Sequence, residues 1–394
     1  MIKTIDDLSL TGKKVIVRVD LNVPVKDGVI SSTKRIEAVV PTIQKLVSEG
    51  AKVILLSHLG RVKEAADLPK RDLTPVAVEL AKQLNQTVTF VNQTKGELVE
   101  KTINEMNNGE VVMLQNTRYE DLNNKAESKN SPELGKYWAS LADVYVNDAF
   151  GTSHRAHASN VGISTYIKES AIGYLVEKET KAMLKAMENP EHPYVAIIGG
   201  AKVSDKIQVL ENLVKIADKM IIGGGMAYTF LKAQGHKVGN SLVENDFLDL
   251  AKDFLAKYSS KVVLPVDHLC ASEFADVAPT HQDIDINDGL MGLDVGPKTI
   301  ELFKETLAGA KTVVWNGPVG VTEFDNYKNG TLEICKMIAS LEDVYSVVGG
   351  GDSVAAVQKL GMEDKFSHVS TGGGASLEML QGLKLPGIEA IQKK

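Results

Sequence analysis

The feature that most constrains this chain is a regular alternation of short Val/Ile-rich runs with longer stretches of helical periodicity. In the first half the apolar runs are KVIVRVD, KVILLSH, VTFV, VVMLQN and VYVNDA. In the second half they are YVAIIGG, KMIIGGG, KVVLPVD, TVVWNGP, SVVGGG and FSHVSTGGG. Continuous apolar runs are typical of strands buried on both faces, and their alternation with helices predicts βαβ units. We therefore expect an α/β fold built from doubly wound, Rossmann-like parallel sheets.

One helical stretch divides the 394 residues into two lobes. Tyr174–Met187 reads YLVEKETKAMLKAM, is rich in strong helix formers and is followed by Asn189-Pro190, which stops a helix. The pattern predicts an N-terminal lobe over residues 1–173, a stiff connector helix over 174–188 and a C-terminal lobe over 189–382.

Composition and charge exclude several classes of protein. The two cysteines, Cys270 and Cys335, are far apart in sequence, which argues against a disulfide framework and against a structural zinc site. The N-terminus has no signal-peptide pattern, and no apolar run approaches the roughly 20 residues of a membrane span. A net charge of −7 argues against general binding to nucleic acids or membranes. We expect a cytoplasmic protein.

Arginine is confined to the first 155 residues, whereas lysine continues throughout. Four arginines stand in polar loops at or near strand ends: Arg35, Arg61, Arg118 and Arg155. His58, His154 and His157 accompany them, and Asp20 and Asn22 follow the first strand as groups able to hold a hydroxyl. A single such arginine is more often a surface ion pair. Four together predict a pocket for a small, strongly anionic molecule.

Four glycine-rich turns follow strands in the second half: IIGGAKVSDK, IIGGGMAY, VVGGGDS and VSTGGGAS. Glycines in one such turn are explained equally well by a tight strand-to-helix connection, but four turns on one sheet edge favour a ligand. Neither GxGxxG nor GxxxxGK[ST] occurs. Lys202 and Lys206, one helical turn apart near a helix start, favour an anionic ligand.

Asp352 is unexpected beside a glycine turn that would suit a phosphate. Asp352 or Ser353 could be the N-cap of the following helix. Alternatively, the carboxylate binds Mg²⁺, which commonly takes one or two carboxylates together with substrate phosphates. The second interpretation predicts a metal-bound nucleotide.

An ordered set of motifs resembles the phosphoglycerate kinases over the whole chain: DLNVP, SHLGR, NDAFGTSHRAHAS, GGAKVSDK, MGLDVGP, WNGPVG, GGGDS and STGGGAS. The resemblance implies a monomeric, two-lobed glycolytic kinase that transfers a phosphoryl group between 1,3-bisphosphoglycerate and ADP, with Mg²⁺, giving 3-phosphoglycerate and ATP. It also implies that residues 383–394 pack back on the N-terminal lobe and that the lobes close about the connector helix. Gln115, where the family usually has glutamate, is a departure that removes no charged ligand.

In the N-terminal lobe, the resemblance assigns the non-transferred phosphate to His58, Arg61, Arg118 and Arg155. It assigns the glycerate part to Asp20 and Asn22, and the reacting carboxyl group or acyl phosphate to Arg35. In the C-terminal lobe it implies that Gly292 lines the adenine pocket, that Glu323 contacts the ribose and that Asn316 lies near the phosphates. The phosphates would also meet Gly200, Lys202, Lys206, Gly350, Gly351 and Ser353, with Asp352 as the magnesium ligand.

The resemblance further implies that Gly372, Gly373 and Gly374 begin a helix facing the transferred phosphoryl group. Because the ADP oxygen or the 3-phosphoglycerate carboxylate is already ionised at neutral pH, no general base is needed. Catalysis then rests on positioning and on charge neutralisation by Arg35, Lys202, Mg²⁺ and that helix start.

Two other classes remain as alternatives. A nicotinamide-dependent dehydrogenase would need the GxGxxG motif that is missing. A non-catalytic, two-lobed anion-binding protein would not need a metal-nucleotide loop. The motifs favour the kinase over both.

Overall fold

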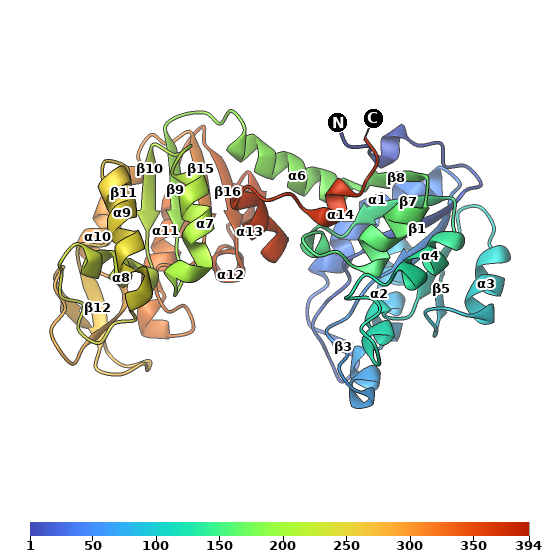
Figure 1. The fold of residues 1–394 in the computed structure, drawn as a ribbon, viewed down its shortest axis with the longest axis horizontal. Helices are drawn as coiled ribbons and strands as arrows, with labels where there is room; N and C mark the ends of the chain where they lie inside the picture. Colours follow the sequence, from blue (N-terminus) through green and yellow to red (C-terminus); the bar gives the residue numbers. More distant parts are fainter. Residues whose placement is uncertain (394) are drawn as a thin grey trace. The chain divides into compact units, whose positions relative to one another are not determined.

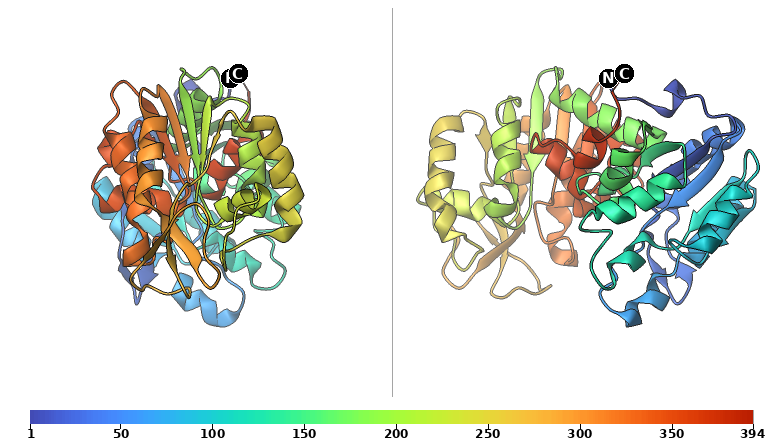
Figure 2. Two further views of the ribbon diagram at one scale, coloured as in Figure 1. Left: turned by 90° about the vertical axis from the view of Figure 1, so that its left-hand side faces the viewer. Right: turned by 45° about the vertical axis from the view of Figure 1, so that its right-hand side comes forward.

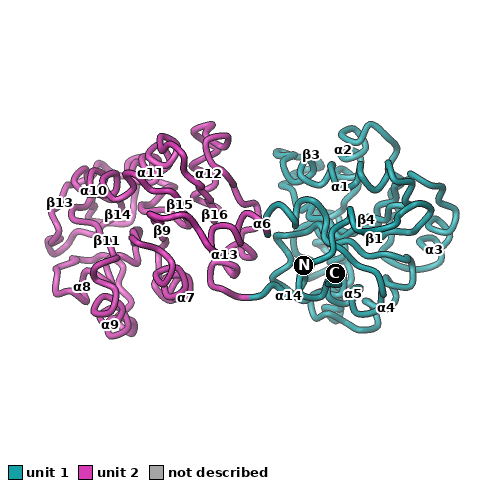
Figure 3. The backbone as a smooth tube through the Cα atoms, turned by 90° about the horizontal axis from the view of Figure 1, so that it is seen from above, with its two compact units in different colours: residues 1–180, 384–394 teal, residues 181–383 magenta. Residues whose placement is uncertain are grey.

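The computed structural model describes residues 1–393, which form two compact α/β units (Figure 3). The first comprises Met1–Thr180 with Lys384–Lys394, and the second comprises Lys181–Leu383. The division falls inside helix α6 (Tyr174–Met187), which has the bounds expected for the connector. Each unit is described separately below.

A parallel six-stranded sheet forms the centre of the first unit, in the order β5-β6-β4-β1-β7-β8 (Figure 1). Its strands are β1 (Lys14–Val19), β4 (Lys52–Leu56), β5 (Val88–Val91), β6 (Val111–Leu114), β7 (Val144–Asp148) and β8 (Glu169–Ile172). The central strand β1 is buried at all but its first residue, as its KVIVRV sequence predicts. The strand β8 was not predicted, because its sequence ESAI is short and half polar.

Helices cover this sheet and complete the first core. The helix α1 buries Ile36, Val39, Ile43 and Leu46 at helical spacing, so one apolar face packs on the sheet. The helices are α1 (Lys34–Ser48), α2 (Thr74–Leu84), α3 (Glu97–Asn104), α4 (Pro132–Ser140), α5 (Ile163–Tyr166) and α14 (Pro386–Glu389). The short elements are η1 (Ile5–Asp7), β2 (Val25–Lys26), β3 (Val29–Ile30), η2 (Ala65–Arg71), η3 (Thr117–Asp121), η4 (Phe150–Thr152) and η5 (Ala158–Gly162).

The C-terminal segment belongs to the first unit. Leu385, Ile388 and Ile391 are buried, and the N–H of Gly387 donates to the carbonyl oxygen of Ser153 at 2.8 Å. The segment ends beside the N-terminus, where Ile2 pairs with Lys393 as an antiparallel bridge.

The second unit has its own parallel six-stranded sheet, in the order β11-β10-β9-β15-β16-β17. Its strands are β9 (Tyr194–Ile198), β10 (Lys219–Ile222), β11 (Val262–Val263), β15 (Thr312–Asn316), β16 (Tyr345–Gly349) and β17 (His368–Val369). Each of these six strands lies within an apolar run that the sequence analysis predicted to be a strand. Strand order reverses between β9 and β15, and ligands of doubly wound sheets bind at that point.

Helices lie on both faces of the second sheet, as the left view of Figure 2 shows. They are α7 (Val203–Leu213), α8 (Met226–Ala233), α9 (Leu248–Tyr258), α10 (Pro297–Leu307), α11 (Asn329–Ala339), α12 (Gly351–Lys359) and α13 (Gly374–Leu380). The short helices are η6 (Asn245–Phe247), η7 (Asp325–Tyr327) and η8 (Glu363–Lys365). None of the helices in residues 1–393 has the length and apolar character needed to cross a bilayer.

A small antiparallel sheet, in the order β13-β12-β14, extends the second unit. Its strands are β12 (His268–Ala271), β13 (Thr280–Gln282) and β14 (Met291–Val295). The sequence analysis missed it, because these strands carry His, Asp, Gln and Gly and have no continuous apolar run.

Candidate functional site

Strand register brings the predicted residues of the first unit to one sheet edge. Arg18 of β1 pairs with Leu56 of β4. Asp20 and His58 each come two residues after this pair, so both lie beyond the carboxyl ends of the two neighbouring strands. The segments that follow β4, β6 and β7 carry three of the four predicted arginines: Arg61, Arg118 and Arg155. This set of side chains, with Arg18, is called the arginine edge below.

Asp20 and Asn22 organise one side of the arginine edge. The carboxylate of Asp20, which is nearly buried, forms an ion pair with Arg35 at the start of α1. The side-chain oxygen of Asn22 accepts the N–H of Gly60 at 2.8 Å and ties the first loop to the SHLGR loop.

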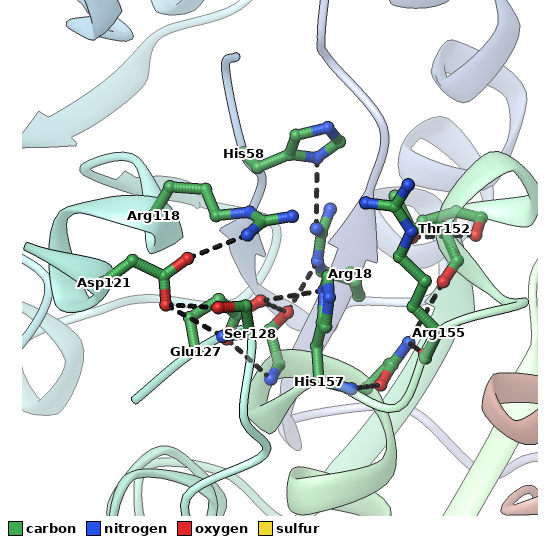
Figure 4. Close-up of polar contacts among 12 residues, drawn as sticks. Arg18, His58, Arg118, Asp121, Glu127, Ser128, Thr152, Arg155 and His157 are labelled. Atoms are coloured by element: carbon green, nitrogen blue, oxygen red, sulfur yellow. Dashed lines mark hydrogen bonds and ion pairs between the residues drawn. The ribbon is translucent and has the colours of Figure 1, made fainter. Parts of the chain in front are cut away.

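Within the arginine edge, His58 and Arg18 contact each other (Figure 4). Nη2 of Arg18 is 3.1 Å from Nδ1 of His58, and its Nε donates to Oγ of Ser159 at 2.8 Å. Burial lowers the pKa of His58 to about 3, although Asp20 opposes the shift. His58 is therefore uncharged at neutral pH.

Three other arginines differ in how firmly they are held. Arg118 donates to Asp121 at 2.8 Å, and Asp121 also accepts the N–H and hydroxyl of Ser128, at 2.8 and 3.0 Å. Arg61 and Arg155 are exposed. Figure 4 shows Arg118 and Arg155 directed toward the region of Arg18 and His58. Like charges gathered in this way favour an anion between them.

Asn116, which the sequence analysis did not single out, links three loops of the arginine edge. It is fully buried. Its side-chain amide donates to the carbonyl oxygens of Leu59 and Arg71, at 2.8 and 2.9 Å. Its side-chain oxygen accepts the N–H of Leu59 at 3.2 Å and of Arg118 at 2.9 Å. Its neighbour Gln115 accepts the N–H of Leu73 and also donates to Asn92, which a glutamate could not do while ionised.

In the second unit, a cavity of about 510 Å³ opens at the turns that follow the strands. Its size is within the range of small-molecule sites. Three predicted nucleotide-site residues line it together with Asp352: Gly200, Gly292 and Glu323. The lining also includes apolar residues that the sequence analysis missed: Tyr228, Leu242, Phe274, Met291, Pro318 and Val319.

The glycine turns pack closely against one another and also line the cavity. A Cβ on Gly199 would lie 2.0 Å from the carbonyl oxygen of Pro318, so this glycine permits two turns to pack backbone against backbone. Gly200 and Gly224, with φ of +137° and +73°, line the cavity. The IIGGGMAY turn was the available sequence signal for Gly224 and Gly225.

Lys206, more than Lys202, is fixed near these turns. Its Nζ donates to the side-chain oxygen of Asn316, at the end of β15. Burial lowers its pKa, while Asp205 and Asp352 oppose the shift. The side-chain nitrogen of Asn316 is buried without a hydrogen-bond partner beside Gly350. Lys202 is exposed at the start of α7.

The N-cap alternative for Asp352 and Ser353 is wrong. Gly350, with φ of +90°, caps α12, and no side chain caps this helix. Oγ of Ser353 instead accepts the N–H of Gly317 at 2.8 Å. Asp352 is exposed at the cavity. Gly373 caps α13 and Gly374 begins it, as expected from the sequence.

The fold and the two sites define a class: a two-unit α/β protein with an arginine edge on one unit and a nucleotide-sized, glycine-lined cavity on the other. A family model described as phosphoglycerate kinase matches residues 5–383. The chain belongs to the phosphoglycerate kinase family, whose members are phosphotransferases with a carboxyl group as acceptor.

Similar proteins cover the full chain. The phosphoglycerate kinase of Spiroplasma citri is 58% identical, over 100% of this chain and 99% of the relative. That of Levilactobacillus brevis is 57% identical, over 99% of each. The solved structure of phosphoglycerate kinase from Coxiella burnetii is 41% identical, with a TM-score of 0.89 over 99% of this chain and 98% of that one. The comparisons give no support to the non-catalytic alternative.

Proposed function

We propose that the chain catalyses reversible, Mg²⁺-dependent phosphoryl transfer between 1,3-bisphosphoglycerate and ADP, giving 3-phosphoglycerate and ATP in glycolysis and gluconeogenesis. The observation that carries the proposal is that the two candidate binding sites, which differ in chemistry, lie on different units. The arginine edge suits a small phosphorylated acid, and the glycine-lined cavity suits a nucleotide.

On the first unit, we assign the non-transferred phosphate to His58, Arg61, Arg118 and Arg155. The fixed Arg118 and the exposed Arg61 and Arg155 supply planar, bidentate donors. Asp20 and Asn22 hold the glycerate part, and Arg35, paired with Asp20, meets the reacting carboxyl group.

On the second unit, the apolar side of the cavity takes the adenine base beside Gly292, and Glu323 takes the ribose. Lys206 and the unpartnered amide nitrogen of Asn316 are assigned to the phosphates. Gly200, which lines the cavity, and the α12 start formed by Gly350, Gly351 and Ser353 are assigned to the phosphates as well.

The residues present fit a magnesium ion that is carried by the nucleotide. Within residues 1–393, no three His, Cys, Asp or Glu side chains gather as a protein-only metal site. Asp352 is an exposed carboxylate at the cavity, without a capping role, and phosphate oxygens would complete the ligand set. When bound, Mg²⁺ supplies positive charge that offsets the phosphate oxygens.

Catalysis by this chain consists of binding, orientation and neutralisation. No general base is assigned, since the attacking oxygen is already ionised. Arg35, Lys202 and the Gly372–Gly374 turn are assigned to the charge of the transferred group. Direct transfer needs reacting atoms about 3 Å apart and water excluded, so we propose that the units close about α6 during turnover. We expect a cytoplasmic monomer.

The test is ATP consumption by the purified chain with 3-phosphoglycerate and Mg²⁺, alongside a Lys202→Ala variant. We expect turnover that needs all three components and falls on the order of 10²-fold or more in the variant. Nucleotide binding without turnover in the wild type would refute the proposed function. Wild-type turnover that the variant retains would refute only the role of Lys202.

A further inference from the structure

Arg18 is the buried arginine of the arginine edge. It is 1% exposed, in the middle of the first sheet. Its guanidinium donates to Oγ of Ser159, to the carbonyl oxygen of Val19 and toward Nδ1 of His58. These three contacts use donors on all three of its nitrogens. Arg18 therefore acts on other protein groups.

The contact with Arg18 determines where His58 carries its proton. A guanidinium has only donors, so Nδ1 of His58 must be the acceptor and the ring proton must be on Nε2. Four charged groups face the ring: Arg18 and Asp20 at β1, Arg35 of α1 and Arg118 of η3. Three of them are cations and favour the neutral ring, as burial does. His58 then has one donor, Nε2–H, on the side away from Arg18 (Figure 4).

Glu127 is fully buried and contacts Ser159, the same residue that accepts from Nε of Arg18. One carboxylate oxygen accepts the N–H of Ser159 at 3.0 Å, and the other accepts the Ser159 hydroxyl. The hydroxyl proton is thereby directed at Glu127, which leaves a lone pair of Oγ for Nε of Arg18. Glu127 thereby makes the Ser159 oxygen an acceptor for Nε of Arg18, and this contact holds the guanidinium in position beside Nδ1 of His58.

We propose that Glu127 is a positioning residue: through Ser159 and Arg18, it holds His58 as the neutral tautomer that carries its proton on Nε2. His58 then offers the phosphate group of the substrate a fixed hydrogen-bond donor and no additional charge. This inference rests on the proposed function for the identity of the anion, but not for the tautomer. Neither the sequence motifs nor the comparisons point to Glu127.

The first test is nitrogen-15 NMR of the full chain with labelled histidine, with the His58 signals assigned by their loss in His58→Gln. In the wild type we expect a protonated Nε2 and a bare Nδ1, unchanged from about pH 5 to about pH 8. A proton on Nδ1, or an imidazolium that titrates in this range, would overturn the proposal. The spectrum decides this point whether or not the protein turns over.

The second test uses Glu127→Gln and Ser159→Ala. Glutamine places an amide donor against one of the two Ser159 donors, and alanine removes the hydroxyl. In both variants we expect a mixture of His58 tautomers and a KM for 3-phosphoglycerate raised about 10-fold, with the KM for MgATP changed less than about 2-fold. A purely structural role would not move the tautomer signals selectively.

Glu169→Gln is the matched control, since Glu169 pairs with Lys13 at 2.9 Å in the same unit and has no contact with this chain of hydrogen bonds. It should leave both readouts at wild-type values. If Glu127→Gln does not fold, Ser159→Ala carries the test. An unchanged tautomer in a folded Glu127→Gln or Ser159→Ala variant would refute the proposal. Absence of wild-type turnover would refute the proposed function and leave the NMR result standing.

Discussion

Asn116 shows how much of the arginine edge depends on one buried side chain. Its four hydrogen bonds reach Leu59, Arg71 and Arg118. Asn116→Ala should lower the free energy of unfolding by about 2–4 kcal/mol, because buried backbone groups lose their partners. It should also raise the KM for 3-phosphoglycerate, because the loops holding His58 and Arg118 loosen.

Chemical denaturation and initial rates check this prediction. The control is Asn104→Ala, which removes an exposed amide that accepts from Lys14 at 2.8 Å. We expect it to change the free energy of unfolding by less than about 0.5 kcal/mol. Equal losses in the two variants would contradict the bridging role of Asn116.

Asp148 makes stability depend on pH at the start of α6. It is fully buried and accepts the N–H of Leu175 at 2.9 Å. Burial raises its pKa to about 7. Between its ordinary value near 4 and about 7, the folded state binds the additional proton, so the free energy of unfolding falls as pH rises through that window.

We therefore expect the wild type to lose roughly 2–4 kcal/mol relative to Asp148→Asn between about pH 4 and about pH 7, with little change above. Denaturation curves of both proteins across this range give the difference directly. In the second unit, the wild type should lose stability relative to Asp294→Asn over the same pH range, since burial raises the pKa of Asp294 to about 7 as well. A difference that is constant with pH would contradict the assignment.

At the scale of elements, long apolar runs allowed correct predictions and mixed runs did not. VIVRV and VVWN are buried on both faces, so β1 and β15 could be read from composition alone. The strands β12 and β14 carry His268, whose ring packs against Tyr228, and Asp294, which accepts the N–H of Gly330 at 3.0 Å; both contacts are distant in sequence. The hydrophobic pattern of the local sequence does not predict contacts of this kind.

The candidate site divides in the same way. Arginines, glycine turns and Asp352 have recognisable chemistry in a linear sequence. Asn116, Glu127 and Tyr228 do not, because their roles come from contacts with loops far away in the chain. The register of β1 with β4 is what places Asp20 beside His58, and register is a property of the sheet.

The packing of α8 against β14 gives a prediction for the nucleotide cavity. A Cβ at Gly292 would lie 2.0 Å from the hydroxyl oxygen of Tyr228, so Gly292→Ala must displace that ring or the strand. We expect the KM for MgATP to rise about 10-fold or more, because both residues line the cavity. Calorimetric titration with nucleotide tests whether its affinity falls in the same way. An unchanged affinity would mean that the adenine base does not bind beside Gly292.

The C-terminal segment is an element that supports the first unit. Removing residues 384–394 deletes three buried apolar side chains and the Gly387 contacts with Ser153 and Asn147. We expect about 5 kcal/mol less stability in the first unit and a lower turnover, because Ser153 immediately precedes the loop of Arg155. Removing residues 393–394 alone is the control. Full turnover and stability in the longer truncation would contradict this account.

At the scale of the whole molecule, the central claim is that each unit holds one substrate. Arg61 is exposed, so Arg61→Gln should leave the fold intact and remove only an anion contact. Gly292→Ala alters only the cavity of the other unit. The two variants therefore report on separate units.

The most direct measurement is a two-substrate initial-rate matrix for the wild type, Arg61→Gln and Gly292→Ala, with 3-phosphoglycerate and MgATP varied independently. We predict a crossed pattern: Arg61→Gln raises the KM for 3-phosphoglycerate alone, and Gly292→Ala raises the KM for MgATP alone. No turnover in the wild type, or equal shifts of both KM values in each variant, would contradict the claim that the two substrates bind on separate units.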